Sequence, residues 1–210
     1  MGKGHISPIV FREGVLYPDC TLFHEELTSI VTEPIRSPHS IYHKNLFQRK
    51  LLELNLINSF STLVLGGLSE FFTLSELIKR IELLRRNYPS SEDIQTTARG
   101  MILLAESNYE VTFSPDKKTA EKVIFPSSPS QSNGIEDARF VLFQEEDGAK
   151  RYYATYTAYD GRVILPQLLK TEDFVTFRFY NLNGLAVRNK GMALFPRKNR
   201  RTICNTRKAG

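Results

Sequence analysis

The chain has 210 residues, of which 41% are hydrophobic, and a formal net charge of +5. This apolar content is enough for a core in one large or two small domains, so disorder over the whole length is excluded. No stretch approaches the roughly 18–20 consecutive apolar residues of a membrane-spanning helix, and residues 1–14 lack the apolar core of a signal peptide. We therefore expect a cytoplasmic protein that makes no contact with a membrane.

The net charge comes from the C-terminal tail. Removing its six basic residues leaves 22 basic against 23 acidic residues, a net charge of −1. A nucleic-acid-binding protein needs a basic face on its folded part, so we expect no nucleic-acid partner. The six residues are Arg197, Lys198, Arg200, Arg201, Arg207 and Lys208.

The residue types that hold metals are sparse. The two cysteines, Cys20 and Cys204, are too few for a disulfide framework or a four-thiolate zinc site. The four histidines have no metal-site spacing with cysteines or acids. The chain also lacks a phosphate-binding glycine loop and a nucleophile elbow around a serine. We expect neither a metal nor a cofactor.

The first half of the chain changes from strand to helix. Residues 6–17 alternate as a short β segment, and residues 18–100 carry apolar residues at helical spacing. One helix is predicted from Thr73, where Glu76 completes a capping box and Phe72 with Leu77 forms a hydrophobic staple. A second is predicted over 44–65, with a buried face made by Leu51, Leu52, Leu54, Ile57 and Phe60. On composition alone, these helices form a small packing bundle.

After Tyr109 the pattern changes to short strands separated by turn signals, which favours an all-β sandwich, barrel or propeller. Asp147-Gly148 and Asp160-Gly161 are predicted hairpin turns. The expected strands are Tyr109–Phe113, Lys122–Phe125, Ile135–Phe143, Arg151–Tyr159, Val163–Leu169, Phe174–Phe179 and Gly191–Phe195.

One predicted strand carries an acid and an arginine at alternate positions. Strict alternation places Asp137 and Arg139 on one face and Glu136 on the other. The guanidinium favours an ionised carboxylate while burial opposes it, so such a pair can set the pKa of an acid. A structural salt bridge explains the same pattern.

Two further groups of residues could bind a ligand. Arg188 and Lys190 share a face if residues 186–190 are extended, and they would hold an anion such as phosphate or form a solvated edge. The segment 152–160, which contains Tyr156 and Asp160, has aromatic and hydroxyl groups that suit sugar binding, although β-propensity explains them equally well.

Three strings taken together resemble glycoside hydrolase family 130, which contains β-mannoside phosphorylases and some β-mannosidases. They are GIEDARF at 134–140, YATYTAYDG at 153–161 and NKGMALFPRK at 189–198. GHIS at 4–7 with IVFR at 9–12 resembles the edge of an early blade in the longer, helix-containing members. The resemblance spans about residues 4–198, and Ala138 stands where many members have proline.

The resemblance implies a five-bladed β-propeller whose funnel holds the sugar. Asp137 matches the general acid, which protonates the glycosidic oxygen directly or through a sugar hydroxyl while inorganic phosphate attacks the anomeric carbon with inversion. Lys190 matches a position that contacts phosphate or substrate, and Arg139 lies beside the acid; parity adds Arg188. Tyr156 and Asp160 complete the expected substrate-binding set. Phosphate is a co-substrate and already carries negative charge, so no general base is needed.

The expected fold class is mainly β, a partial five-bladed β-propeller with an inserted α-helical subdomain. Residues 1–17 form propeller edge strands, 18–100 the helical insertion, 101–198 the blades with the active site, and 199–210 a basic tail unlike the family. These strands fill only about two blades, so we expect an incomplete copy of a longer enzyme.

The expected activity is phosphorolysis of β-mannosides to mannose 1-phosphate. The expected partners are a β-mannoside oligosaccharide and inorganic phosphate, and a homo-oligomer is left open. A β-mannoside hydrolase and an inactive carbohydrate-binding fragment remain as alternatives.

Overall fold

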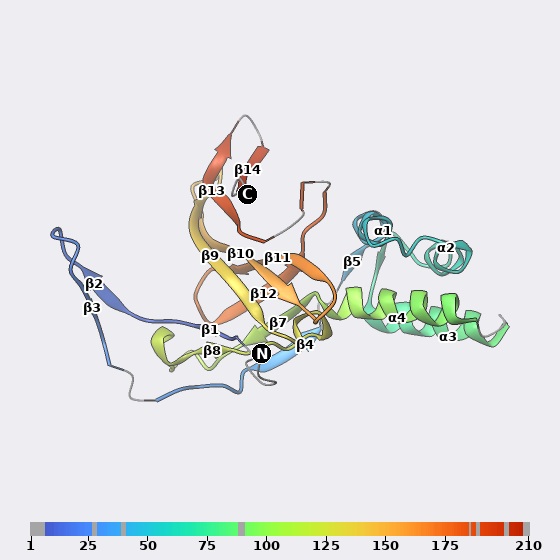
Figure 1. Ribbon diagram of the computed structural model, residues 1–210, viewed down its shortest axis with the longest axis horizontal. Coiled ribbons are helices and arrows are strands. Elements are labelled where there is room, and N and C mark those ends of the chain that lie inside the picture. The colour runs from blue at the N-terminus through green and yellow to red at the C-terminus, as the bar shows by residue number, and fades with distance from the viewer. Residues whose placement is uncertain are drawn as a thin grey trace.

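The computed structural model describes residues 7–26, 29–38, 41–87, 91–184, 186–187, 190–199 and 202–207, with the backbone alone at 198–199 and 202–207. Its centre is a six-stranded antiparallel sheet in the order β4-β7-β12-β11-β10-β9 (Figure 1). The strands are β4 (Ile35–Pro38), β7 (Tyr109–Thr112), β9 (Ile135–Gln144), β10 (Lys150–Tyr159), β11 (Ile164–Thr171) and β12 (Thr176–Asn181).

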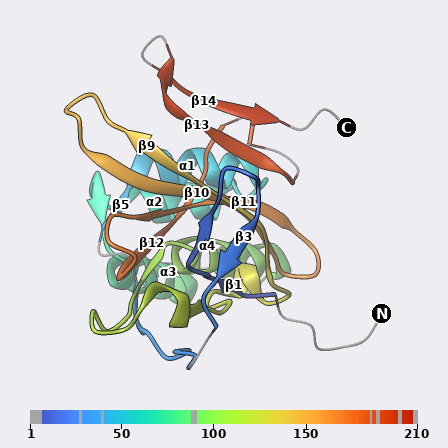
Figure 2. The ribbon, with the colours of Figure 1, turned by 90° about the vertical axis from the view of Figure 1, so that its left-hand side faces the viewer.

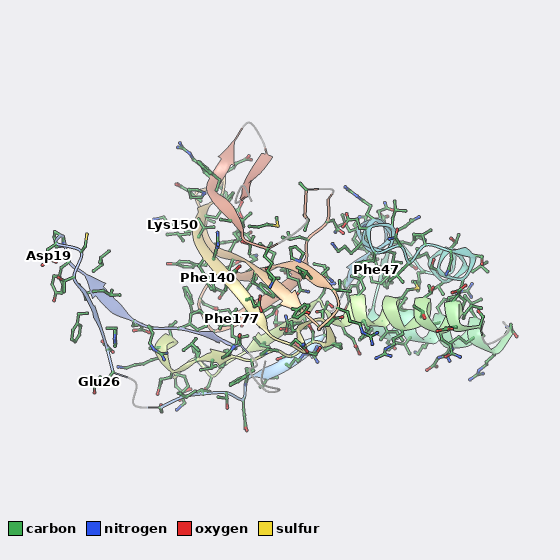
Figure 3. All side chains as sticks on the ribbon, in the orientation of Figure 1. Asp19, Glu26, Phe47, Phe140, Lys150 and Phe177 are labelled. Carbon is green, nitrogen blue, oxygen red and sulfur yellow. The ribbon has the colours of Figure 1, made fainter. Side chains whose placement is uncertain are left out.

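In the part of the chain that the structure describes, four two-stranded pairs accompany this sheet. The pair β13–β14 lies on the opposite side of β9 and β10 from β1 and β8 (Figures 1 and 2). The hairpin β2–β3 projects from the body with Asp19 near its tip and every strand residue exposed (Figure 3). The pairs are β1 (Ile9–Val10) with β8 (Val123–Ile124), β2 (Gly14–Leu16) with β3 (Leu22–His24), β5 (Tyr42–His43) with β6 (Phe71–Phe72), and β13 (Met192–Asn199) with β14 (Thr202–Arg207).

The four α-helices of the described residues lie together at one end of the molecule (Figure 1). They are α1 (Lys44–Glu53), α2 (Ser59–Gly66), α3 (Leu74–Asn87) and α4 (Glu92–Glu106); two short 3-10 turns, η1 (Thr119–Glu121) and η2 (Pro129–Gln131), follow. The mainly β fold class is therefore confirmed, together with helices between β5 and β7. The described residues form no closed propeller, and the propeller stays a prediction. No described helix has the length and apolar character needed to cross a membrane.

The capping prediction for α3 is confirmed. The Thr73 backbone N–H donates to Glu76 Oε2 at 2.8 Å, and the Glu76 N–H donates to Thr73 Oγ1 at 3.2 Å. Phe72 and Leu77, the predicted staple, are both buried in the helical core. The reciprocal hydrogen bonds satisfy backbone donors that would otherwise lack partners at the helix start.

The prediction of one helix over 44–65 is wrong. Asn55 adopts a left-handed conformation with φ of 56°, which ends the first helix, and Asn58 accepts from the Ser61 N–H at 3.0 Å to start the next. Asparagine tolerates this backbone region better than most residues and is a favoured N-cap, so two asparagines override the apolar periodicity. Leu52, expected to be buried, is 66% exposed.

The predicted helical region, 18–100, begins too early in the chain and ends too early as well. Residues 18–43 contain β3, β4 and the short β5, and the helices extend to Glu106. Pairing with β7 draws β4 into the main sheet, a long-range contact that local spacing does not reveal. All seven strands predicted after Tyr109 are present, and β14 occupies part of the tail for which no strand was expected.

The core has two hydrophobic clusters, one on the sheet and one among the helices. Between them lies a polar network around Gln131, which is fully buried. Its Oε1 accepts from Tyr109 Oη at 2.8 Å, and its Nε2 donates to Tyr156 Oη at 2.9 Å. Gln167 continues the network, donating from Nε2 to Asn181 Oδ1 at 2.7 Å and to the Ser107 carbonyl at 3.3 Å. The sheet is thereby connected to the end of α4.

Replacing Gln131 with leucine should lower the unfolding free energy by about 3–5 kcal/mol. The variant leaves the Tyr109 hydroxyl and the Ser127 backbone N–H without their buried acceptor, at roughly 1–3 kcal/mol for each unpaired group. Urea denaturation measures the loss. The matched control Gln144→Leu changes an exposed glutamine and should stay within about 0.5 kcal/mol. Equal effects of the two substitutions would contradict the assigned role of the network.

Stability should fall as the pH rises from about 10 to about 12. Burial raises the pKa of both Tyr42 and Tyr153 from 10.0 to about 12, and it also raises the pKa values of Tyr109 and Tyr156. Below pH 10 the phenols are neutral in both states; above it the unfolded chain ionises first, so the stabilisation is lost toward the folded pKa.

Urea denaturation across this pH range, with phenolate absorbance, tests the alkaline loss. Tyr42→Phe should flatten the pH dependence of the unfolding free energy. Tyr17→Phe, which alters a side chain 51% exposed, should leave that slope unchanged. A slope insensitive to Tyr42→Phe would show that burial of this phenol does not drive the effect.

Candidate functional site

The strand β9 carries a bulge at the predicted acid. Arg139 pairs with Thr155 and Glu136 pairs with Thr157, so two residues of β9, Asp137 and Ala138, lie opposite Tyr156 alone. Asp137 has φ of 54°, in the left-handed region that few non-glycine residues adopt. Its side chain is exposed. The bulge therefore places the carboxyl at the surface rather than in the sheet core.

The bulge overturns the parity argument made from the sequence. Thr155 and Thr157 are two positions apart on a regular strand, so Glu136 and Arg139, their partners, share one face. Alternation had separated Glu136 from Asp137, yet both carboxylates raise the pKa of the Lys190 ammonium, Glu136 more strongly because it also hydrogen-bonds to it. One extra residue in the strand reverses the expected facing.

Lys190 joins this face from the loop before β13. Its Nζ donates to Glu136 Oε2 in a half-exposed ion pair and lies 5.7 Å from the centre of the Tyr159 ring. The hydrogen bond to Glu136 is the main reason that the pKa of Lys190 is raised. The ammonium is therefore held over the start of β9 and the end of β10.

Backbone carbonyls at the start of β13 accept hydrogen bonds from side chains of β9 and β10. Arg139 Nη1 donates to the Gly191 carbonyl at 3.5 Å, and Thr155 Oγ1 donates to the Met192 carbonyl at 2.5 Å. Thr155 is 1% exposed, so these contacts close the sheet face beneath β13. We call the group Glu136, Asp137, Arg139 and Lys190 the bulge site.

The structure does not bring all six predicted site residues together. Tyr156 is 2% exposed and its hydroxyl belongs to the Gln131 network in the core, so it does not reach the bulge site. Asp160 closes the β10–β11 turn by accepting from the backbone N–H groups of Arg162 and Val163 at 2.8 and 2.6 Å. Arg188 lies outside the described residues.

Sequence reasoning missed Glu136 and Tyr159 as neighbours of Lys190. Glu136 was set aside because the alternation was assumed to be unbroken. A bulge of this kind is most recognisable when glycine occupies the left-handed position, whereas here it is an aspartate, which tolerates that region only moderately. The GIEDARF string contains three of the four bulge-site residues but gives no sign of their local geometry.

The bulge site carries two carboxylates and two cations, so its formal charge is balanced. The Asp137 side chain is exposed, which leaves its carboxyl accessible to a solute. Lys190 is already paired, so an anion must compete with Glu136 for it. Among the described residues no cluster of three or more histidine, cysteine or acidic side chains has metal-binding geometry.

Comparison with protein-family models, with curated proteins and with solved structures gives no significant match to this chain.

The left-handed backbone at Asp137 predicts an inverted order of glycine and alanine. Asp137→Gly should be about 1–2 kcal/mol more stable than Asp137→Ala, since glycine adopts positive φ without the Cβ penalty. At Gln144 of the same strand, which is not among the positive-φ residues, the alanine variant should instead be the more stable. Urea denaturation of the four variants measures both differences. The same order at the two positions would contradict the bulge.

Proposed function

We propose that the chain belongs to a carbohydrate-active enzyme that cleaves β-mannosides by inverting phosphorolysis, releasing mannose 1-phosphate. Asp137 is the general acid, and Lys190 with Arg139 provides the positive charge for phosphate. The proposal draws on the resemblance of three strings to glycoside hydrolase family 130 and on how the folded chain arranges them.

The observation that carries the proposal is the convergence of these three strings on one surface. GIEDARF supplies Glu136 and Arg139, which contact Lys190 and Gly191 of NKGMALFPRK. YATYTAYDG supplies Thr155 beneath Met192 and the Tyr159 ring beside Lys190. The first and third strings, more than fifty residues apart in the sequence, thus meet beside the residue before the proposed acid. If the three strings resembled the family only because they form strands, their polar residues would have no reason to lie at one place.

The proposed reaction uses a single carboxylic acid. Asp137 gives its proton to the glycosidic oxygen, directly or through a sugar hydroxyl, as the bond from that oxygen to the anomeric carbon breaks. A phosphate oxygen forms the new bond to the anomeric carbon from the opposite face. Phosphate is already an anion, so no second carboxylate has to activate it, unlike the water of an inverting hydrolase.

Glu136 has a defined place in this scheme. It holds the Lys190 ammonium through an ion pair, which keeps the cation beside Asp137 before phosphate arrives. Phosphate carries more charge than a carboxylate and more acceptor oxygens, so it can displace Glu136 from Lys190. Removing the Glu136 charge should therefore ease phosphate binding while removing the Lys190 charge weakens it.

Hydrolysis is the second candidate, and one observation favours it. Glu136 supplies a second carboxylate within electrostatic reach of the same ammonium as Asp137, and an inverting hydrolase needs two carboxylates. The two reactions differ in their products. Phosphorolysis gives mannose 1-phosphate only when phosphate is present, whereas hydrolysis gives free mannose without it.

Asp137→Asn should separate acid catalysis from binding. With phosphate and a β-linked mannobiose, the variant should lose about 10²–10⁴ of the cleavage rate, which is the usual contribution of a general acid. An aryl β-mannoside has a leaving group that needs little protonation, so its cleavage should fall much less. Chromatography of the sugar phosphate and release of the aryl alcohol measure the two rates.

Glu136→Gln and Lys190→Met complete this test as a matched pair. The first should lower the KM for phosphate and the second should raise it, because they remove opposite charges from the same ion pair. If free mannose forms without phosphate, the reaction is hydrolysis and the phosphorolysis proposal is wrong. Sugar binding with no turnover in either assay would overturn the enzymatic proposal in favour of carbohydrate binding.

A further inference from the structure

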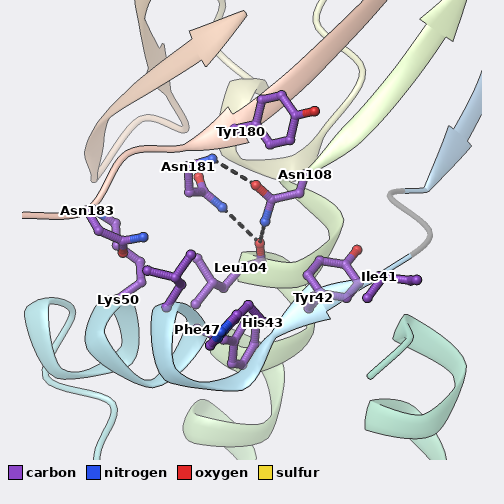
Figure 4. Close-up of a pocket in the computed structure, with 11 residues that line it drawn as sticks. Ile41, Tyr42, His43, Phe47, Lys50, Leu104, Asn108, Tyr180, Asn181 and Asn183 are labelled. Atoms are coloured by element: carbon purple, nitrogen blue, oxygen red, sulfur yellow. Dashed lines mark hydrogen bonds between the residues drawn. The ribbon is translucent and has the colours of Figure 1, made fainter. Parts of the chain in front are cut away.

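A cavity lies between the helices and the sheet (Figure 4), and no bulge-site residue lines it. Its volume is about 230 Å³, many times the roughly 10–15 Å³ that one water needs. The first turns of α1 form one wall, and the end of α4 with the end of β12 forms the other. A solute of several heavy atoms can therefore enter it.

Two buried polar atoms without hydrogen-bond partners belong to residues that line this cavity. Among the described side chains the buried orphan atoms are His43 Nδ1, Asn183 Oδ1 and Arg80 Nε, and the first two are at this cavity. Buried polar groups in folded proteins are nearly always paired, so two orphans at one cavity point to a missing partner. Arg80 does not line it.

Both orphan atoms are acceptors. Asn183 Oδ1 is a carbonyl oxygen, and His43 Nε2 lies 3.7 Å from the Glu70 carboxylate. That carboxylate favours the tautomer with the proton on Nε2, which leaves a lone pair on Nδ1. A ligand that satisfies the cavity must therefore donate at least two hydrogen bonds. Both atoms are shielded from solvent, so a small rotation of each side chain accompanies binding.

The charge of the cavity is balanced by a buried ion pair. Lys50 is 4% exposed, and its Nζ donates to Glu53 Oε2 at 2.9 Å and to the Leu182 carbonyl at 2.8 Å. These contacts use two of the three ammonium protons, leaving one N–H for a ligand acceptor. A cation would meet the ammonium, and an anion would meet a lysine that is already neutralised. The cavity therefore favours a neutral ligand with both donors and acceptors.

The rest of the lining is largely apolar. Tyr42 is stacked on Phe72 with ring centres 5.4 Å apart, and Phe47 makes T-shaped contacts with both rings. Leu46, Leu104 and Tyr180 add further apolar surface. C–H groups pack on such surface, and hydroxyl groups supply both donors and acceptors without carrying charge. A saturated ring or chain that carries several hydroxyl groups meets both requirements.

We propose that this cavity binds a neutral polyhydroxylated compound of monosaccharide size. Its hydroxyl groups donate to His43 and Asn183 and accept from Lys50, while its C–H groups pack on Phe47 and Leu104. The site is independent of the proposed enzymatic function, because none of the bulge-site residues lines it. The Gly184 N–H donates to Glu53 Oε1 at 2.7 Å, next to this cavity. A bound ligand would therefore stabilise the packing of α1 against the loop at Leu182 and Gly184.

Saturation-transfer NMR with D-mannose, without phosphate, tests the site in the full chain. Mannose should receive saturation from the wild-type protein, and variants of the cavity that leave every bulge-site residue in place should reduce that signal. Asn183→Leu removes one orphan acceptor at similar volume and should weaken mannose binding about tenfold, the effect of one lost hydrogen bond. The control Asn45→Leu alters an exposed asparagine of α1 that lines a different groove, and it should bind mannose as the wild type does.

Thermal melting of Asn183→Leu shows whether any loss of binding reflects unfolding. Leucine replaces an unpaired buried oxygen, so the variant should melt at or above the wild-type temperature. His43→Phe, which keeps a ring against Phe71, provides a second route to the same loss. No saturation transfer from the wild-type protein, or a wild-type affinity for mannose in both cavity variants, would overturn the proposal.

Discussion

The buried amide of Gln131 is the constraint on which the two halves of the molecule depend. It joins Tyr109 of β7 to Tyr156 of β10, and Gln167 carries the connection to the end of α4. Hydrogen bonds in a low-dielectric interior are strong when every member is paired and costly when one is missing. The network therefore fixes how the helical cluster and the sheet cluster meet, which apolar packing alone would define less sharply.

A second set of contacts joins the helices to the chain that leaves the sheet. Lys50 and Glu53 at the end of α1 hold the backbone at Leu182 and Gly184, just after β12. The same stretch continues toward Lys190, which reaches back over β9 and β10 to Glu136. The proposed polyol cavity lies at this clamp, so a ligand there would stiffen the start of the loop.

The bulge site and the cavity solve different electrostatic problems. At the bulge site the charges are exposed and exchangeable, so phosphate can replace Glu136 on Lys190 at modest cost in a high-dielectric setting. In the cavity the Lys50–Glu53 pair is buried, where separating the partners would leave an uncompensated charge. The first arrangement suits an anionic co-substrate and the second a neutral ligand. Each proposal rests on its own residues and is tested separately.

The sequence by itself determined the elements whose signals are local. The Thr73–Glu76 capping box, the seven strands after Tyr109 and their turns follow from nearest neighbours along the chain. It also selected Asp137, Arg139 and Lys190, through strings whose gathering at one surface it could not demonstrate. Only the tertiary structure decided the break at Asn55, the pairing of β4 with β7, the burial of Tyr156 and the bulge that turned Glu136 toward Lys190. These features depend on which strand faces which, and a backbone shift of one residue reverses a side chain without leaving a local trace in the sequence.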